Sequence, residues 1–165
     1  MRLKSNLRRA LITLVVLGVG VQFVPYGRNH AAPPVLGEPT WDSARTRELA
    51  RRACFDCHSS ETRWPWYTHV APVSWLVQHD VDEGRAVLDF TAWTRPSEEA
   101  SESAESVLEG EMPPRPYLWL HPSARLDAAD QDALVQGLTR TFGSEATGRD
   151  GEGDGEGDGE DEQDG

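Results

Sequence analysis

Hydrophobic and polar positions divide the chain into an apolar segment near the N-terminus, a middle with helical periodicity and a polar C-terminal end. Residues 10–24 are apolar with few exceptions and follow a basic start that contains Arg2, Lys4, Arg8 and Arg9. A basic start before an apolar run is typical of an export signal. The run is short for a spanning helix, which needs ~20 residues, but residues 25–26 extend it into the membrane interface.

We expect residues 1–26 to be an uncleaved signal-anchor, with a cleaved signal peptide as the alternative. No clear site of small residues follows the apolar run, and such a site is what a signal peptidase requires. The basic residues keep the N-terminus in the cytoplasm. The sequence therefore predicts an anchor in the cytoplasmic membrane, with the rest of the chain on the periplasmic or extracytoplasmic side.

The middle of the chain predicts four helices, and the first two are placed by their caps. The first begins at a cap supplied by Thr40 or Asp42 and leads into Cys54. The second opens at Pro72, where a missing amide hydrogen costs little, and its apolar face ends near Phe90.

Capping and stop residues also set the bounds of the other two predicted helices. Ser97 caps a very acidic helix, whose early glutamates favour its N-terminal dipole and which Gly110 stops. Asp127 caps the last helix, which runs to Phe142 and is closed by Gly143.

Proline, glycine and acidic residues mark the segments on either side of this helical region. Residues 27–39 are a linker by their proline and glycine content, and residues 40–143 form the single domain. Residues 144–165 end in alternating glycine and acidic residues that can bury nothing, so we expect a disordered acidic tail.

The net charge of −12 is unevenly distributed along the 165 residues. Residues 150–165 carry nine acidic groups and no basic one, whereas residues 27–149 hold 12 basic and 19 acidic groups, a net charge of −7. A phosphate-binding surface would be basic, so this distribution argues against a nucleic-acid partner. An acidic face suits a basic electron-transfer partner, but we favour the simpler interpretation of a soluble surface.

Both cysteines of the chain lie in one short stretch, Cys54-Phe-Asp-Cys57-His58. The pattern C-x-x-C-H is the attachment signature of c-type haem, in which two thiols form thioethers and the histidine ligates iron. Two intervening residues put both sulfurs on one side of a helical turn. The motif lies at the C-terminal end of the first predicted helix, where the class I cytochrome c fold also places it.

The same cysteines have other interpretations: a dithiol redox pair, half of a zinc site, a structural disulfide, or two buried thiols. Zinc would need two further ligands at tight spacing, and the sequence offers no third cysteine and no close histidine pair. No βαβ pattern surrounds the motif, as a thioredoxin-like site would require. We therefore predict an all-α, cytochrome c-like domain of about four helices around one covalently bound haem c.

The sixth ligand of the iron is a separate question. Met112 is the best candidate, because it lies in a proline-rich loop between two helices, with a gap-filling core methionine as the alternative. His121 and His69 are competing ligands. For His58 we expect a backbone carbonyl near Pro65 or Pro72 to accept the other imidazole proton.

An ordered series of short motifs resembles the small haem-binding-domain proteins of bacteria, a c-type cytochrome-like family. The series comprises Cys54-Phe-Asp-Cys57-His58-Ser-Ser-Glu61-Thr, Trp64-Pro-Trp-Tyr67, Ala71-Pro-Val-Ser-Trp75-Leu, Gly84-Arg85, Phe90-x-x-Trp93, Gly110-Glu-Met112-Pro, Tyr117 and His121-Pro-x-Ala124. It covers about residues 45–140, and Gln22-Phe23 beside the membrane also looks like that family. The resemblance implies covalent haem on Cys54 and Cys57, with His58 as the proximal iron ligand.

These observations favour a membrane-anchored monohaem electron carrier with an unidentified redox partner protein. The alternative is a haem-based sensor or peroxidase-like protein with an open or labile sixth ligand, and a third hypothesis is a haem-free thiol or zinc module. An electron carrier needs no catalytic residues, so we favour a non-enzymatic role. No nucleophile–base pairing or phosphate-binding glycine loop indicates hydrolysis or nucleotide chemistry.

Overall fold

The structure, a computed structural model, describes residues 2–94 and 97–147. Those residues form helices joined by loops, without a β-strand, which confirms the predicted all-α class. The helices are α1 (Arg2–Gly20), η1 (Val21–Phe23), α2 (Ala44–Ala53), α3 (Phe55–His58), η2 (Trp66–His69), α4 (Val73–Val87), α5 (Glu98–Leu108), α6 (Arg115–Leu120), η3 (Pro122–Ala124) and α7 (Ala128–Thr147). Most of the predicted acidic tail lies outside the described residues.

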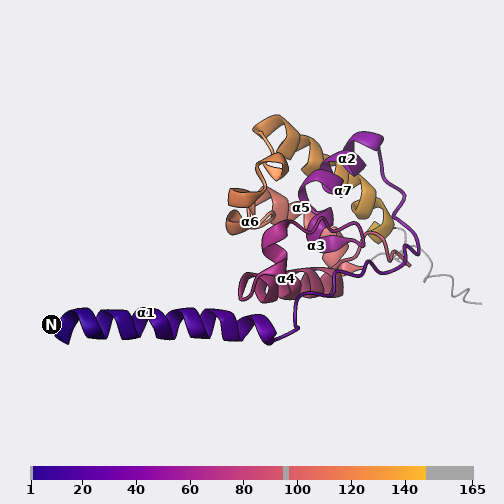
Figure 1. Ribbon diagram of the computed structural model, residues 1–165. Coiled ribbons are helices and arrows are strands. Elements are labelled where there is room, and N and C mark those ends of the chain that lie inside the picture. The colour runs from indigo at the N-terminus through magenta and orange to yellow at the C-terminus, as the bar shows by residue number, and fades with distance from the viewer. Residues whose placement is uncertain (1, 95–96, 148–165) are drawn as a thin grey trace, which may run out of the picture.

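Helix α1 extends away from the other helices, which pack together beyond its C-terminal end (Figure 1). Residues Lys4–Phe23 are long and apolar enough to cross a membrane by length and composition, and none of this segment is buried. Apolar side chains exposed to water are unfavourable, and a bilayer would remove them from it. The helix fits the predicted signal or anchor.

The core of the domain lies where α5 and α7 pack along each other and α2 packs across α7. The buried cluster includes Leu49, Phe55, Phe90, Ala100, Ala104, Val107, Leu134, Leu138 and Phe142. Phe90 stacks between Phe55 and Phe142, with ring centroids 5.6 and 6.2 Å away. The core therefore reaches directly to the cysteine motif, because Phe55 lies between the two cysteines.

The first two domain helices differ from the predictions at their ends. Helix α2 is capped by Ser43, whose hydroxyl accepts the N–H of Thr46 at 3.1 Å, and not by Thr40 or Asp42. The predicted second helix, α4, has Pro72 at its N-cap and stops at Val87, before the predicted end near Phe90.

The predicted caps of α5 and α7 are confirmed. Ser97 accepts the N–H of Ala100 at 3.3 Å, and Asp127 accepts that of Asp130 at 2.8 Å. Gly110 follows the C-cap of α5, Glu109. Its φ of 73° is a left-handed conformation that favours glycine and ends the helix.

The predicted stop at Gly143 is wrong, because α7 continues to Thr147. Gly143 does not have a positive φ, so nothing at this position turns the chain out of the helix. Helix α6 is a second difference: it begins at Arg115, only three residues after Met112, and so shortens the predicted proline-rich loop.

Candidate functional site

The two cysteines and His58 lie on one helical turn that directly follows α2. The Cys54 N–H donates to Ala50 at 2.7 Å, and the Cys54 carbonyl then accepts from both Cys57 and His58, at 3.1 and 3.0 Å. A spacing of three residues places two side chains on the same face of a helix. The predicted position of the motif at the end of the first domain helix is therefore confirmed.

The two residues between the cysteines are buried and hold this turn against the domain. Phe55 is 1% exposed and packs between Phe90 and Trp41. Asp56 is 6% exposed, whereas Cys54 and Cys57 are both half-buried. Burial of the intervening side chains fixes the orientation of the turn.

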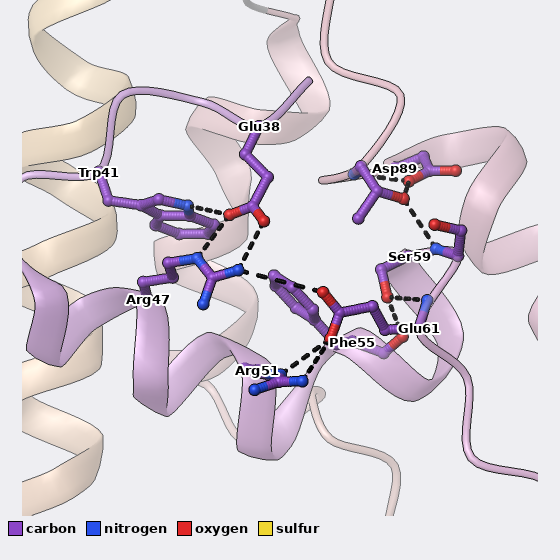
Figure 2. A network of polar contacts seen from close by, with 10 residues as sticks. Glu38, Trp41, Arg47, Arg51, Phe55, Ser59, Glu61 and Asp89 are labelled. Atoms are coloured by element: carbon purple, nitrogen blue, oxygen red, sulfur yellow. Dashed lines mark hydrogen bonds and ion pairs between the residues drawn. The ribbon is translucent and has the colours of Figure 1, made fainter. Parts of the chain in front are cut away.

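A network of ion pairs supports the outer side of the motif (Figure 2). Glu38, from the linker, accepts two hydrogen bonds from Arg47 at 2.7 and 2.6 Å and one from Trp41 at 2.9 Å. One helical turn further along α2, Arg51 pairs with Glu61 at 2.7 Å. The linker, α2 and the loop after the motif are thus connected around the Phe55 ring.

Asp56 connects the motif to two distant segments. Its carboxylate accepts the backbone N–H, Nε and Nη2 of Arg63 at 3.0, 3.0 and 2.9 Å, and the hydroxyl of Tyr117 at 2.7 Å. Burial opposes ionisation, but the bonds from Arg63 and Tyr117 together outweigh it and hold the pKa of Asp56 below its ordinary value. Burial and the bond to Asp56 raise the pKa of Tyr117, which stays a hydroxyl donor.

The sequence did not predict this role of Asp56. Charged residues are usually exposed, so an aspartate between the two cysteines gave no indication that it would be buried. The only available hint was Arg63, seven residues later.

Cys54 and Cys57 are free thiols with strongly raised pKa values. Burial is the main cause that raises the pKa of Cys54 to about 12, and the charge of the neighbouring Cys57 thiolate is a smaller one. Burial is also the main cause that raises the pKa of Cys57 to about 11, and the charges of Asp56 and Asp80 add to it. A redox-active dithiol needs a lowered pKa to form its thiolate, so this environment argues against a thioredoxin-like pair.

His58 is oriented by the carbonyl of Leu88, which lies 3.0 Å from its Nδ1. The predicted carbonyl near Pro65 or Pro72 is therefore wrong. Because a carbonyl only accepts, Nδ1 carries the proton and Nε2 keeps its lone pair for a ligand bond. The end of α4 at Val87 gives the Leu88 carbonyl its position, and no sequence pattern indicated it.

Glycine at position 84 lets α4 approach the motif. A Cβ built on Gly84 would lie 2.7 Å from the carbonyl oxygen of Cys57 and 3.1 Å from its Cβ. Backbone oxygen cannot move aside as a flexible side chain can. Gly84 therefore determines how closely α4 packs on the motif, a role that the sequence alone did not reveal.

Met112 lies in the segment between α5 and α6 and is 40% exposed. Its N–H donates to the Ser106 carbonyl at 3.1 Å. The exposure contradicts the alternative of a gap-filling core methionine. Tyr117, five residues further on, reaches Asp56, so the Met112 segment is connected to the motif through α6.

The competing histidines are engaged elsewhere in the structure. His121 donates from Nδ1 to the Tyr117 carbonyl at 2.9 Å, so its Nε2 accepts from the Tyr67 hydroxyl at 2.9 Å. The exposed His69 ring lies 4.5 Å from that of His30, which stacks on Trp64 at 4.1 Å. Either histidine would have to leave these contacts to ligate iron.

The donor set in the described residues fits haem better than a simple metal ion. No cluster of three or more histidine, cysteine or acidic side chains that could hold a metal occurs in residues 2–94 and 97–147. Two unoxidised thiols and an imidazole with a free Nε2 on one turn are instead the groups that covalent haem requires.

Comparison with known protein families gives a match to a model described as a haem-binding domain, over residues 16–140. The match covers 125 of the 165 residues and includes the motif, the Met112 segment and His121. Comparisons with curated proteins and with solved structures gave no match.

Proposed function

From the premise that this chain belongs to the haem-binding domain family, we propose that it is a membrane-anchored monohaem cytochrome of the c type that transfers electrons. One haem is held by thioethers to Cys54 and Cys57, with His58 as the proximal iron ligand. Helix α1 anchors the chain in the cytoplasmic membrane, and the haem domain lies on the periplasmic side, where it meets a redox partner protein.

The orientation of His58 is the observation that carries this proposal. Its Nδ1–H is bonded to the Leu88 carbonyl, which fixes the ring and leaves Nε2 as the ligand atom. The raised pKa values of the two thiols add support, because they disfavour a redox-active dithiol. Bound haem supplies a one-electron couple, and the protein sets its potential through the axial ligands and burial.

Met112 is the proposed distal ligand. Its partly exposed side chain is available, whereas both ring nitrogens of His121 are already bonded. The bond between Tyr117 and Asp56 supports this assignment, since it ties α6, and with it the Met112 segment, to the motif.

The distal ligand is tested by comparing Met112→Ala with Glu111→Ala, a control in the same loop. Methionine as a ligand raises the haem potential, so we expect Met112→Ala to lower the midpoint potential and to change the ferrous absorption spectrum. Glu111→Ala should change neither. Unchanged spectrum and potential in Met112→Ala would show that methionine does not ligate the iron.

The haem-based sensor or peroxidase-like alternative differs in its sixth coordination position. Rapid binding of carbon monoxide by the native ferrous protein would favour that alternative over an electron carrier. A carrier with histidine and methionine ligands should bind carbon monoxide slowly, or only after Met112→Ala has opened the position.

A further inference from the structure

Five exposed apolar residues lie in or beside η2, at the start of α4 and at the end of α6. They are Trp66 (78%), Val70 (43%), Val73 (40%), Trp119 (74%) and Leu120 (61%), and together they are called the interfacial patch below. An exposed group of large apolar side chains usually marks an interaction surface. None of the five belongs to the buried core described above.

Contacts between the elements bring these residues together. The Tyr67 hydroxyl donates to His121 at 2.9 Å, which joins η2 to the end of α6. Trp66 precedes Tyr67 in η2, and Trp119 with Leu120 precedes His121. Two tryptophans from segments 53 residues apart are therefore held at one junction.

The end of the anchor helix lies beside the same junction. Gln22, in η1, binds the backbone of Ala71 twice: its Oε1 accepts the N–H at 3.1 Å and its Nε2 donates to the carbonyl at 2.8 Å. Ala71 lies between Val70 and Val73. The two valines of the patch therefore adjoin the point where the chain leaves α1.

A second contact holds this arrangement in place. Gly27 has a φ of 73°, and a Cβ on it would lie 2.3 Å from the carbonyl oxygen of Ser74. The segment after α1 is thus packed against the start of α4 and does not act as a free tether. In Figure 1, α6 lies on the side of the domain toward which α1 extends.

We propose that the interfacial patch rests in the headgroup region of the outer leaflet of the membrane that α1 crosses. The proposal rests on the proposed function, because it requires α1 to be an anchor. Tryptophan side chains favour the membrane interface, where an apolar ring and a polar N–H are both accommodated. With Gln22 at the end of the span, the patch begins at the height of the headgroups, and the haem domain is held in one orientation on the membrane.

Tryptophan emission tests this proposal, because α1 contains no tryptophan and the patch contains two of the six in the chain. The full-length haem protein is reconstituted into vesicles of phosphatidylcholine, either unmodified or brominated near the headgroup end of its acyl chains. We expect the emission to be weaker in brominated than in unmodified lipid, since two of the six tryptophans reach the interface. The double variant Trp66→Ser, Trp119→Ser should lose this quenching and keep the haem absorption spectrum.

A matched pair of valine variants locates the contact. Val73 and Val87 are both exposed and lie at opposite ends of α4, roughly 21 Å apart at 1.5 Å per residue. Val73→Ser should reduce the quenching of the two patch tryptophans, whereas Val87→Ser should leave it unchanged.

The contradicting results separate this proposal from the one on which it rests. Protein that floats with the vesicles but shows no bromine quenching would overturn the patch and leave the anchor intact. Protein that does not float would overturn both. A double variant that loses its haem spectrum would show that Trp66 and Trp119 line the haem pocket, which also overturns the patch.

Discussion

Replacing Asp56 by asparagine tests whether the residue inside the motif ties it to the rest of the domain. In the native chain Oδ1 accepts the backbone N–H and Nε of Arg63, while Oδ2 accepts Arg63 Nη2 and the Tyr117 hydroxyl. Asp56→Asn keeps one carbonyl oxygen but places an NH2 group opposite Nη2 and the hydroxyl. Two charge-assisted hydrogen bonds are therefore lost or reversed.

The expected cost follows from those two bonds. A hydrogen bond to a charged group contributes about 1.5–3 kcal/mol. The Arg63 side chain is 56% exposed, so water replaces part of its bond, and the Tyr117 hydroxyl can turn to accept. We expect Asp56→Asn to lower the free energy of unfolding at pH 7 by about 2 kcal/mol.

The assay is denaturant unfolding of the haem-loaded protein, with the midpoint as readout and an unchanged slope as the sign of two-state behaviour. Glu48→Gln is the control, because Glu48 forms an exposed ion pair with Arg45 at 2.9 Å. Such a pair contributes less than about 1 kcal/mol. Glu48→Gln should therefore shift the midpoint less than Asp56→Asn does.

The pH dependence provides the sharper test. The pKa of Asp56 in the folded chain lies below the ordinary 3.8, so its stabilisation is present above that value and is lost as the pH falls through the folded pKa. The difference between the native chain and Asp56→Asn should be constant from pH 7 to 5 and shrink below about pH 4. A difference that persists unchanged at the lowest pH at which both fold would refute the role of the carboxylate.

Three further substitutions test the packing around the motif. Gly84→Ala should lower the free energy of unfolding by about 1–3 kcal/mol, because the new Cβ would lie 2.7 Å from the Cys57 carbonyl oxygen. Gly143→Ala is the control and should be neutral or stabilising, because its Cβ would meet only a side chain at 3.8 Å. Equal denaturation midpoints for the two variants would contradict the close approach of α4. Phe55→Ala removes a 1%-exposed ring from the core and should cost about 3–5 kcal/mol in the same assay, and a cost below about 1 kcal/mol would contradict its anchoring role. Ser97→Ala removes the cap of α5 and should cost about 1 kcal/mol, and no loss would show that the cap is not used.

Local signals in the sequence predicted most of the helical framework. Hydrophobic periodicity and side-chain caps act over three or four residues, which is why Ser97 and Asp127 were assigned correctly. The wrong prediction of the cap of α2 arises because such local signals do not distinguish between neighbouring capping residues. Thr40, Asp42 and Ser43 are all capping residue types within four positions. In the structure Asp42 is instead bonded to Thr141 and Arg140 of α7, and Ser43 is the cap.

The candidate site was predictable only in part. The motif itself is local, so its helical turn and its position after α2 followed from the sequence. The Leu88 carbonyl lies 30 residues from His58, and the Tyr117 hydroxyl lies 61 residues from Asp56. Contacts between residues so far apart in the sequence depend on how α4 and α6 pack, and no local sequence pattern predicts them.

Mass spectrometry of the purified, fully denatured protein tests the central claim most directly, provided that the protein is expressed with export and haem maturation intact. The account predicts that denatured protein keeps one haem, and that Cys54→Ala and Cys57→Ala each remove one thioether while the double substitution leaves the chain without covalent haem. Release of all haem on denaturation of the native chain, with both thiols recovered unmodified, would contradict it.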